Sequence, residues 1–259
     1  MTATQPKTAQ PTLAAESRPP KLTVVTGGGR GIGAAICRRL AAEGHDVVVG
    51  YRNDAAAADR VASDIRAAGR RALTVAVDTT DESSVIALFE RAAELGIVTG
   101  LVNNAGSVCA VGTLADNDLA AIRRDLDVNL VGVLACAKYA IRAMTPTGGG
   151  AIVNISSAAA TLGSAGSYVH YAAAKAGVDA LTVGLAKEVA ALGIRVNAVA
   201  PGTIWTDFHQ DPQRPARVAE TVPLGRAGQP EEIAGAVAWL LSDDAGYATG
   251  TVIRVAGGL

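Results

Sequence analysis

Residues 22–33 read Leu22-Thr23-Val24-Val25-Thr26-Gly27-Gly28-Gly29-Arg30-Gly31-Ile32-Gly33. The first five residues are β-branched or apolar types that favour a strand, and the run then breaks into glycines. Ile32, Ile36 and Leu40 recur at helical spacing until Gly44, a common stop signal for a helix. This stretch therefore predicts a buried strand, a tight glycine turn and a helix.

The glycine turn has the context of a phosphate-binding loop. Main-chain N–H groups and the positive end of the helix face an anion, and the missing side chains let a pyrophosphate approach. Gly27, Gly31 and Gly33 have the spacing TGxxxGxG, with a longer first interval than the common dinucleotide fingerprint. A plain glycine-rich turn is the alternative.

The rest of the chain repeats the alternation of strand and helix. Apolar runs predict strands at residues 47–50, 72–77, 101–102, 151–156, 194–200 and 251–255, and helical spacing predicts helices at 58–68, 85–92, 117–144, 171–192 and 230–241. Thr79 and Glu82 form a candidate capping box. Apolar strands between amphipathic helices indicate a parallel sheet covered on both faces. We predict an α/β fold: a single Rossmann-type, doubly wound domain over residues 21–259 with a mostly seven-stranded parallel sheet.

Composition limits the classes of function. The 259 residues carry a net charge of −1, without the basic stripe of a nucleic-acid-binding protein or an apolar run of about 20 residues that could cross a membrane. Cys37, Cys109 and Cys136 are widely spaced and odd in number, which suits a reducing cytoplasm. Scattered histidines and the lack of a CxxC pair predict no metal site. Residues 1–20 are rich in Pro, Thr, Ala and Gln, and we expect a disordered tail there.

The stretch Tyr171-Ala172-Ala173-Ala174-Lys175 is a candidate catalytic pair on an alanine-rich helix. Its two ionisable side chains are four residues apart and share one face. A phenol is a poor acid or base near neutrality, but an ammonium one turn away favours the phenolate and should lower the Tyr171 pKa. The pair can then exchange a proton with a hydroxyl or carbonyl group. A chance pairing on an exposed helix is the alternative.

Several motifs stand in the order found in short-chain dehydrogenases/reductases, and the chain resembles that family. The motifs are residues 26–33, Asn103 to Gly106, Asn129, Ser156-Ser157, Tyr171 to Lys175 and Pro201-Gly202, which together span nearly everything after the tail. The chain is most similar to bacterial members known as glucose 1-dehydrogenases and 3-oxoacyl-carrier-protein reductases. The resemblance implies hydride transfer between a nicotinamide cofactor and a carbonyl or alcohol.

The resemblance also implies the catalytic roles of Asn129, Ser157, Tyr171 and Lys175. Tyr171 would be the general acid/base, and Lys175 would lower its pKa and bind the nicotinamide ribose. Asn129 would hold a water that links Lys175 to solvent. A serine hydroxyl would donate to the substrate oxygen, where negative charge develops.

The choice of serine depends on a loop length. The family usually places this serine one residue nearer to the tyrosine, at the position of Ala158 here. We therefore expect a one-residue insertion in the loop 163–168 and choose Ser157, with Ser156 as the alternative. Only one of the two can face Tyr171, because successive strand side chains point to opposite faces. Tyr168 has Ala172 in place of a lysine four residues on, and we expect it to line the pocket.

By the same resemblance, the cofactor-binding residues come from the turns and loops at the carboxyl ends of the strands. They are Gly27, Gly29, Arg30, Gly31, Ile32, Gly33, Tyr51, Arg52, Asp78, Thr79, Asn104, Ala105, Gly106, Tyr171, Lys175, Pro201, Gly202, Ile204 and Thr206. Asp78 would meet the adenine, with a solvated loop carboxylate as the alternative. An ordinary turn is the alternative for residues 103–106, because Asn and Gly favour turns for local reasons.

The segment after the sixth strand, about residues 203–225, is broken by prolines. It is interpreted as a substrate lid, with a plain surface loop as the alternative. In a lid, Trp205, Phe208 and His209 would shape the substrate pocket. The sequence of this segment does not identify a substrate.

The end of the second strand favours NADP(H). In this fold an Asp or Glu there accepts hydrogen bonds from both ribose hydroxyls and selects NAD. Tyr51 takes that position here, Arg52 follows it, and Arg30 lies in the glycine turn. Two guanidinium groups suit a dianionic 2′-phosphate. The alternative is that both arginines are simply solvated. Asp54 is close enough in sequence to weaken the preference for NADP(H), although it lies beyond the end of the strand, so binding of NAD(H) is also possible.

We therefore predict a cytoplasmic NADP(H)-dependent oxidoreductase that acts on a small-molecule carbonyl or secondary alcohol. One alternative is reduction of an acyl-carrier-bound 3-oxo thioester. Another is a non-catalytic dinucleotide-binding sensor, against which the four catalytic residues together argue. By resemblance, the chain assembles as a homotetramer or homodimer through the helices containing Asn129 and Tyr171 and through the C-terminal strand.

Overall fold

The computed structural model describes residues 21–208 and 211–259, so the predicted N-terminal tail and His209 lie outside the described residues. A seven-stranded sheet runs in the order β3-β2-β1-β4-β5-β6-β7, and each pair of neighbours is parallel. The strands are β1 Leu22–Val25, β2 Asp46–Tyr51, β3 Ala72–Ala76, β4 Val98–Asn103, β5 Gly150–Ile155, β6 Ile194–Pro201 and β7 Val252–Val255. The predicted single α/β domain is confirmed.

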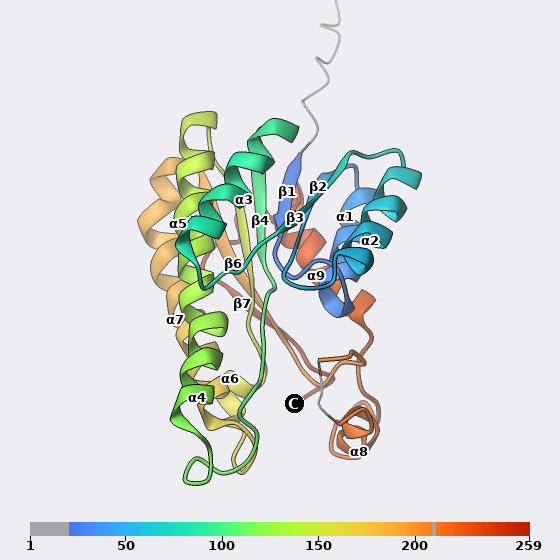
Figure 1. The fold of residues 1–259 in the computed structure, drawn as a ribbon, viewed down its shortest axis with the longest axis vertical. Coiled ribbons are helices and arrows are strands. Elements are labelled where there is room, and N and C mark those ends of the chain that lie inside the picture. The colour runs from blue at the N-terminus through green and yellow to red at the C-terminus, as the bar shows by residue number, and fades with distance from the viewer. Residues whose placement is uncertain (1–20, 209–210) are drawn as a thin grey trace, which may run out of the picture.

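Helices cover both faces of this sheet (Figure 1). One face carries α1 Gly31–Ala42, α2 Ala55–Ala67 and α9 Pro230–Leu241, and the other carries α3 Glu82–Leu95, α5 Gly132–Met144 and α7 Val169–Val189. Three shorter helices are α4 Leu119–Leu126, α6 Ala159–Leu162 and α8 Arg214–Ala219. Ile36, Val61 and Val237 belong to one buried apolar cluster, and Leu88 and Val189 to another. The sheet thus separates two hydrophobic cores.

The strand order reverses between β1 and β4, where such folds have their ligand crevice. Val25 is paired with Val49 on one side and with Val102 on the other. The glycine turn after β1 therefore leaves the sheet beside the loop after β4. Asn104 fixes the two loops together, because its Nδ2 donates to the carbonyl oxygens of Thr26 (2.9 Å) and Gly27 (3.0 Å).

A buried chain of polar side chains joins β4, β5 and α7 behind this crevice. Asn103 Nδ2 donates to Asn154 Oδ1 at 2.9 Å, and Asn154 Nδ2 donates to Thr182 Oγ1 at 2.9 Å. All three residues are buried. Buried polar groups that bond one another in fixed directions set the position of α7 against the sheet.

The predicted Thr79–Glu82 capping box is wrong. Asp78 Oδ1 accepts hydrogen bonds from the main-chain N–H and the hydroxyl of Thr80, so a tight turn occupies the residues before the helix. Helix α3 then begins at Glu82, and the Asp81 carboxylate caps it by accepting from the Ser83 N–H at 3.1 Å. A carboxylate two residues later in the chain, Asp81, replaces the expected Thr79 as the cap.

The helical segment Leu119–Thr147 is long and apolar enough to cross a membrane by length and composition alone. In the structure it comprises α4, one π-helical turn, α5 and a short 3-10 turn. Helix α5 packs against β4 and α3, and Cys136, Ala140 and Met144 are buried in that contact. Packing against the sheet accounts for the apolar composition of α5.

Candidate active site

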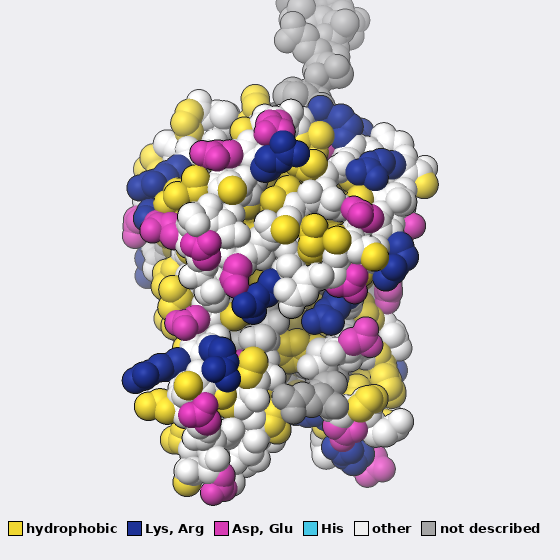
Figure 2. Space-filling model, viewed as in Figure 1, with side chains coloured by type: hydrophobic (Ala, Val, Ile, Leu, Met, Phe, Trp, Pro, Cys, Tyr) yellow, Lys and Arg dark blue, Asp and Glu magenta, His cyan; other side chains and the backbone are white. Residues whose placement is uncertain are grey.

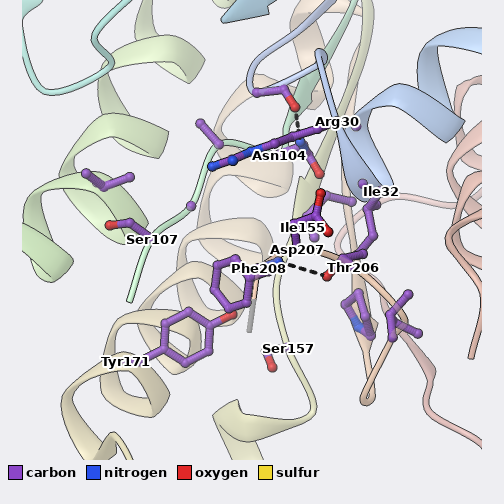
Figure 3. A pocket seen from close by; sticks show the side chains of 18 of the residues that line it. Arg30, Ile32, Asn104, Ser107, Ile155, Ser157, Tyr171, Thr206, Asp207 and Phe208 are labelled. Atoms are coloured by element: carbon purple, nitrogen blue, oxygen red, sulfur yellow. Dashed lines mark hydrogen bonds between the residues drawn. The ribbon is translucent and has the colours of Figure 1, made fainter. Parts of the chain in front are cut away.

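A cavity of about 600 Å³ lies at the carboxyl ends of the strands, and Figure 3 shows its side chains. Every residue predicted above to bind the cofactor lines it, as does Ser157. In the view of Figure 2 the molecule is hollowed between the segments that carry α4 and α8, and side chains of both charges are interspersed over that face. Sequence motifs that are far apart in the chain thus meet in one place.

The glycine turn has the shape of a phosphate cradle. Gly27 and Gly31 have positive φ angles of 63° and 53°, which glycine adopts without steric cost. A Cβ on Gly33 would overlap the Gly27 carbonyl oxygen and lie 2.5 Å from Asn104 Nδ2. The first N–H groups of α1 have no partner within the helix. The turn therefore fits the pyrophosphate of a dinucleotide, because only main chain lies against the anion.

The end of β2 brings Tyr51 and Arg52 to the cavity, with no carboxylate in the strand position that selects NAD. Arg52 Nη2 forms an ion pair of 2.8 Å with Asp78 Oδ2. Hydrogen bonds from Thr80, together with the Arg52 charge, hold the pKa of the Asp78 carboxyl below its usual value. The Arg52 side chain is 62% exposed, so its charge stays within reach of a ligand.

Tyr171, Ser157 and Lys175 converge on the opposite end of the cavity. Tyr171 and Lys175 are buried on α7, and Ser157, which follows β5, lines the same cavity and acts to lower the Tyr171 pKa. Ser156 faces away, because its hydroxyl donates to the Lys175 carbonyl oxygen at 3.3 Å. Ser157 is therefore the serine at Tyr171. Figure 3 shows Ser157 and Tyr171 below Phe208.

Burial controls the electrostatics of this group. Desolvation raises the pKa of the Tyr171 phenol well above its usual value, which the Ser157 side chain only partly offsets. Desolvation also lowers the pKa of Lys175 to about 8. The predicted lowering of the Tyr171 pKa is wrong for this structure. The Lys175 ammonium donates instead to the Ile155 carbonyl oxygen at 2.8 Å and lies 5.6 Å from the centre of the tyrosine ring.

Asn129 lies in the π-helical turn Asp127–Val131 and is fully buried beside the cavity, not in its lining. Its Nδ2 donates to the carbonyl oxygens of Ser107 (2.6 Å) and Asp125 (2.8 Å). Its Oδ1 is buried without a hydrogen-bond partner in the described part of the chain. A buried amide oxygen without a partner fits the water expected at Asn129. Single π-helical turns within α-helices also occur frequently at functional sites.

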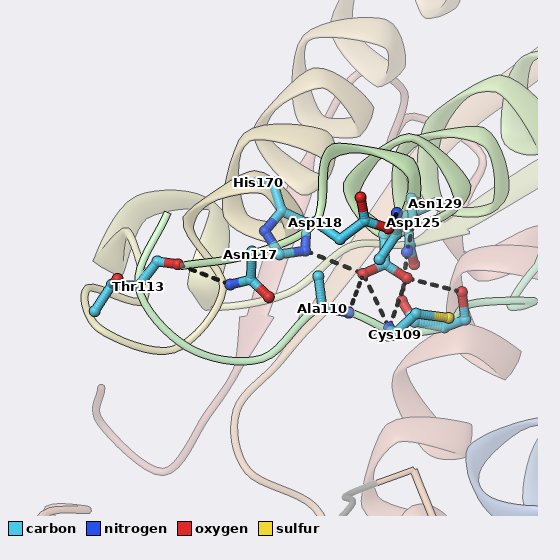
Figure 4. Close-up of polar contacts among 10 residues, drawn as sticks. Cys109, Ala110, Thr113, Asn117, Asp118, Asp125, Asn129 and His170 are labelled. Atoms are coloured by element: carbon cyan, nitrogen blue, oxygen red, sulfur yellow. Dashed lines mark hydrogen bonds and ion pairs between the residues drawn. The ribbon is translucent and has the colours of Figure 1, made fainter. Parts of the chain in front are cut away.

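A buried carboxylate behind the cavity was not expected from the sequence (Figure 4). Asp125 is fully buried at the end of α4, and its oxygens accept from the N–H groups of Cys109 (2.7 Å) and Ala110 (3.0 Å) and from Ser107 Oγ (3.3 Å). His170 Nε2 lies 3.0 Å from the same carboxylate. His170 immediately precedes Tyr171, so this group ties the loop after β4 to the start of the catalytic helix. No spacing rule pairs residues 125 and 170.

The remaining wall of the cavity is aromatic and apolar. Tyr168 contacts Tyr171 edge to face at 5.3 Å between ring centres, and Phe208 lies 6.1 Å from Tyr171. Arg214, from α8, lies 5.6 Å from the centre of the Tyr168 ring. Trp205 is 42% exposed and does not line the cavity, so its predicted role in the pocket is wrong. No group of three or more His, Cys, Asp or Glu able to hold a metal occurs among the described residues.

Comparison with known proteins identifies the family. The family model described as enoyl-(acyl carrier protein) reductase matches residues 27–259. A solved short-chain dehydrogenase/reductase from Serratia marcescens has a TM-score of 0.86 and 36% identity, over 92% of this chain and 97% of that one. The chain belongs to the short-chain dehydrogenase/reductase family.

Two further relatives bear on the activity of this short-chain dehydrogenase/reductase. The chain is 47% identical over 243 residues to cis-4-hydroxycyclohexanecarboxylate dehydrogenase of Sinomonas cyclohexanicum, covering 92% of this chain and 96% of the relative. A blue fluorescent protein from a metagenomic library, solved in complex with NADPH, has a TM-score of 0.86 and 37% identity, over 92% of this chain and 97% of that one. The protein is thus an oxidoreductase of a family that binds nicotinamide dinucleotides and acts on CH–OH groups.

Proposed function

We propose that this short-chain dehydrogenase/reductase uses NADP(H) to interconvert a carbonyl and a secondary alcohol, with Tyr171 as general acid/base. The observation that carries the proposal is that the Tyr171 and Ser157 side chains line one wall of the same cavity, together with the buried Lys175. Two hydroxyl donors at one point suit a single substrate oxygen. The Sinomonas relative is named for a secondary alcohol, which supports the same reaction class.

The bound nicotinamide supplies or accepts a hydride at the carbon of the reacting group. Tyr171 then gives a proton to the carbonyl oxygen, or takes one from the hydroxyl in the reverse direction. At neutral pH the phenol is protonated, which is the form that can give a proton to the carbonyl oxygen. Ser157 donates to the same oxygen where negative charge develops, and this stabilises the transition state more than the ground state.

Lys175 and Asn129 return the proton to Tyr171 in this proposal. The Lys175 pKa of about 8 lies near neutrality, so the ammonium can release and regain a proton at small free-energy cost. The buried Asn129 Oδ1, which has no partner among the described residues, supports a water bound between this amide and Lys175. Lys175 would also hold the nicotinamide ribose.

The proton-transfer role is tested by Tyr171→Phe, which removes one oxygen and keeps the ring. We expect turnover of a carbonyl substrate to be abolished, while the affinity for NADPH stays within a few-fold. Tyr247→Phe is the matched control, because that tyrosine is fully exposed outside the cavity and its loss of a hydroxyl should leave activity unchanged. Activity of Tyr171→Phe above a tenth of the wild type would count decisively against the assigned role.

The residues at the end of β2 support a preference for NADP(H). The exposed ion pair between Arg52 and Asp78 is worth at most about 1 kcal/mol, so a dianionic phosphate can compete for the guanidinium. Arg30 lines the same part of the cavity and adds a second positive charge. An NAD-selecting carboxylate is replaced by Tyr51. These observations support binding of a 2′-phosphate between the two arginines.

Cofactor selectivity is measured as kcat/KM for NADPH and NADH with one substrate. We expect the wild type to prefer NADPH, and Arg52→Ala to lose at least tenfold with NADPH while changing little with NADH, which is the scale of one charge-assisted contact. Arg60→Ala removes an exposed arginine of α2 outside this cavity and is the matched control. Equal kcat/KM for both cofactors in the wild type would refute the preference.

The segment 203–225 is proposed to act as a substrate lid. Most of its first part lines the cavity, as do two side chains of its helix α8; these residues are Thr203, Ile204, Thr206, Asp207, Phe208, Arg214 and Val218. A β-bridge between Ile204 and Gly228 ties its start to the residues that follow it. The segment therefore forms one wall of the cavity from a single stretch of chain, an arrangement that supports closure over a bound substrate.

A homotetramer or homodimer in the cytoplasm completes the proposal. Val131 and Leu134, around the start of α5, and Val183, on α7, are 49%, 44% and 39% exposed, which supports pairing of these helices. Three free cysteines suit a reducing compartment. Light scattering that shows a stable monomer at micromolar concentration would remove the assembly from the proposal.

A further inference from the structure

The end of the cavity beside Tyr171 combines apolar walls with the positive charge of Arg214, in addition to the buried Lys175. Leu162, Phe208 and Val218 line this end together with Tyr168 and Arg214. In such surroundings a charge interacts more strongly than at an open surface, because little water screens it. A substrate group held here would therefore be recognised mainly by shape and by its charge.

Arg214 is held in place by an aromatic ring. Its guanidinium carbon lies 5.6 Å from the centre of the Tyr168 ring, and the Tyr168 ring in turn contacts Tyr171 at 5.3 Å. A guanidinium packed against a ring keeps the N–H donors on its edge for a planar acceptor such as a carboxylate. The Arg214 charge also acts to lower the pKa of Tyr171, so its field reaches the reacting hydroxyl.

The other charges around the cavity have partners or lie at the cofactor end. Arg52 pairs with Asp78, and Lys175 donates to the Ile155 carbonyl oxygen. Arg30 belongs to the glycine turn. On the lid, the Asp211 carboxylate forms an ion pair with Arg217.

Two more residues complete the cavity lining. The Asp207 carboxylate lies beside Thr206, and Figure 3 shows it on the side of the glycine-turn residue Ile32. Leu259 also lines the cavity, and its carbonyl oxygen accepts a hydrogen bond from Arg254 at 3.1 Å. Among the described residues that line the substrate end, Arg214 is therefore the cationic side chain that can meet a substrate.

We propose that Arg214 binds the carboxylate of an oxo acid or hydroxy acid whose reacting carbon lies at Tyr171. The inference rests on the proposed function, because it names the substrate class of the same site. A single guanidinium matches a monoanion, whereas a phosphate ester would call for more than one cation. The Tyr168 ring contacts both Arg214 and Tyr171 and so links the two residues. Several carbon atoms must therefore separate the carboxylate of the substrate from its reacting carbon.

The test compares oxo acids with their methyl esters, which differ in charge and one methyl group. The probes are 5-oxohexanoate and 4-oxocyclohexanecarboxylate with their esters, and the readout is kcat/KM followed as NADPH oxidation. We expect the wild type to prefer the acid of a pair by about tenfold or more. Arg214→Gln should lower kcat/KM for the acid by about 10–100-fold and for the ester by less than about threefold, the range for losing a charge-assisted hydrogen bond.

Two further variants separate charge from packing. Arg214→Lys keeps the positive charge without the planar fork and should recover part of the preference for the acid. Arg217→Gln removes a neighbouring arginine of α8 that does not line the cavity, and should leave both substrates unchanged. Binding of NADPH by each variant, followed by fluorescence, verifies that the fold is retained.

Failure of this inference is distinguishable from failure of the proposed function. If the wild type reduces acid and ester equally, or if Arg214→Gln lowers both equally, Arg214 only packs against Tyr168 and the anion site is overturned. The proposed function survives that result. If the wild type binds NADPH and reduces none of the four probes, the inference is overturned and the result counts against the proposed function as well.

Discussion

The buried Asp125 carboxylate offers a sharp test of how the loop after β4 is held. We expect Asp125→Ala to destabilise the protein by about 3 kcal/mol or more. Alanine would leave the buried N–H groups of Cys109 and Ala110, and the imidazole of His170, without their acceptor. Each buried donor left unsatisfied costs about 1–3 kcal/mol, and this change leaves three of them without an acceptor.

The same change should reduce activity through position. Asn129 donates to the carbonyl oxygens of Ser107 and Asp125, and His170 immediately precedes Tyr171. A loop that loses its carboxylate anchor no longer fixes these groups, and small displacements of catalytic groups are costly. We expect kcat to fall by about tenfold or more, because Asp125 acts through its neighbours and not on the substrate.

Thermal unfolding and steady-state kinetics measure both effects. In a protein of this size, 1 kcal/mol corresponds to roughly 2–4 °C, so Tm should fall by roughly 6–12 °C. Asp127→Ala is the matched control, since that carboxylate is exposed on the same helical segment and should change Tm by less than about 2 °C. Asp125→Asn keeps one acceptor oxygen, and its Tm should lie between those of the wild type and Asp125→Ala. A Tm for Asp125→Ala within about 3 °C of the wild type would refute the reasoning.

Three more outcomes are expected. Ser157→Ala should lower kcat by about 10²–10³, more than Ser156→Ala does; the reverse order in steady-state assays would move the oxyanion role to Ser156. Gly33→Ala should abolish NADPH binding in fluorescence titrations, because its Cβ would overlap the Gly27 carbonyl oxygen, and unchanged affinity would contradict the cradle. Burial lowers the His45 pKa to about 4. Between about pH 6.5 and 4 the unfolded state therefore binds more protons than the folded state, and the free energy of unfolding falls by up to about 3 kcal/mol as the pH drops through that range. His45→Gln should flatten the dependence of Tm on pH there, and equal slopes would rule out His45 as the cause.

The cofactor end of the cavity could be predicted from the sequence because its residues lie in short, contiguous stretches of the chain. The glycine turn lies between a strand and a helix in one short stretch, and residues 103–106 directly follow a buried strand. Parallel strands bring their carboxyl ends to one edge, so these segments meet once the strand order is known. The spacing of Tyr171 and Lys175 along one helix is local in the same sense.

Other parts of the site depend on packing between distant segments, and the sequence did not indicate them. Asp125 and His170 pair across α4 and α7, with no motif that relates them. The direction of the Tyr171 pKa shift depends on how completely the ring is buried, which outweighs the charge of Lys175. The π turn at Asn129 is one residue wider than an α-helical turn, and helical spacing does not distinguish the two.

The two ends of the cavity also differ in what makes contact with a ligand. At the cofactor end, main-chain groups form the phosphate cradle. The positive-φ glycines and the start of α1 fit a pyrophosphate whatever the neighbouring side chains are. At the substrate end, the cavity is lined by side chains from α8 and from the segment 203–208, and the proposal assigns the contacts with the substrate to them. Replacement of Arg214 or Val218 would change what binds beside Tyr171 without disturbing the sheet.

The way the lid is attached strengthens this separation. The Ile204–Gly228 bridge ties one part of the lid, and the Leu224 N–H donates to the Gly257 carbonyl oxygen at 3.0 Å near the C-terminus. Helix α8 lies between these two attachments, so its side chains can vary while the ends of the segment keep their positions. In the proposal above, the glycine turn of the fold therefore accommodates the dinucleotide, and substrate class depends on a few side chains on one short helix and its flanks.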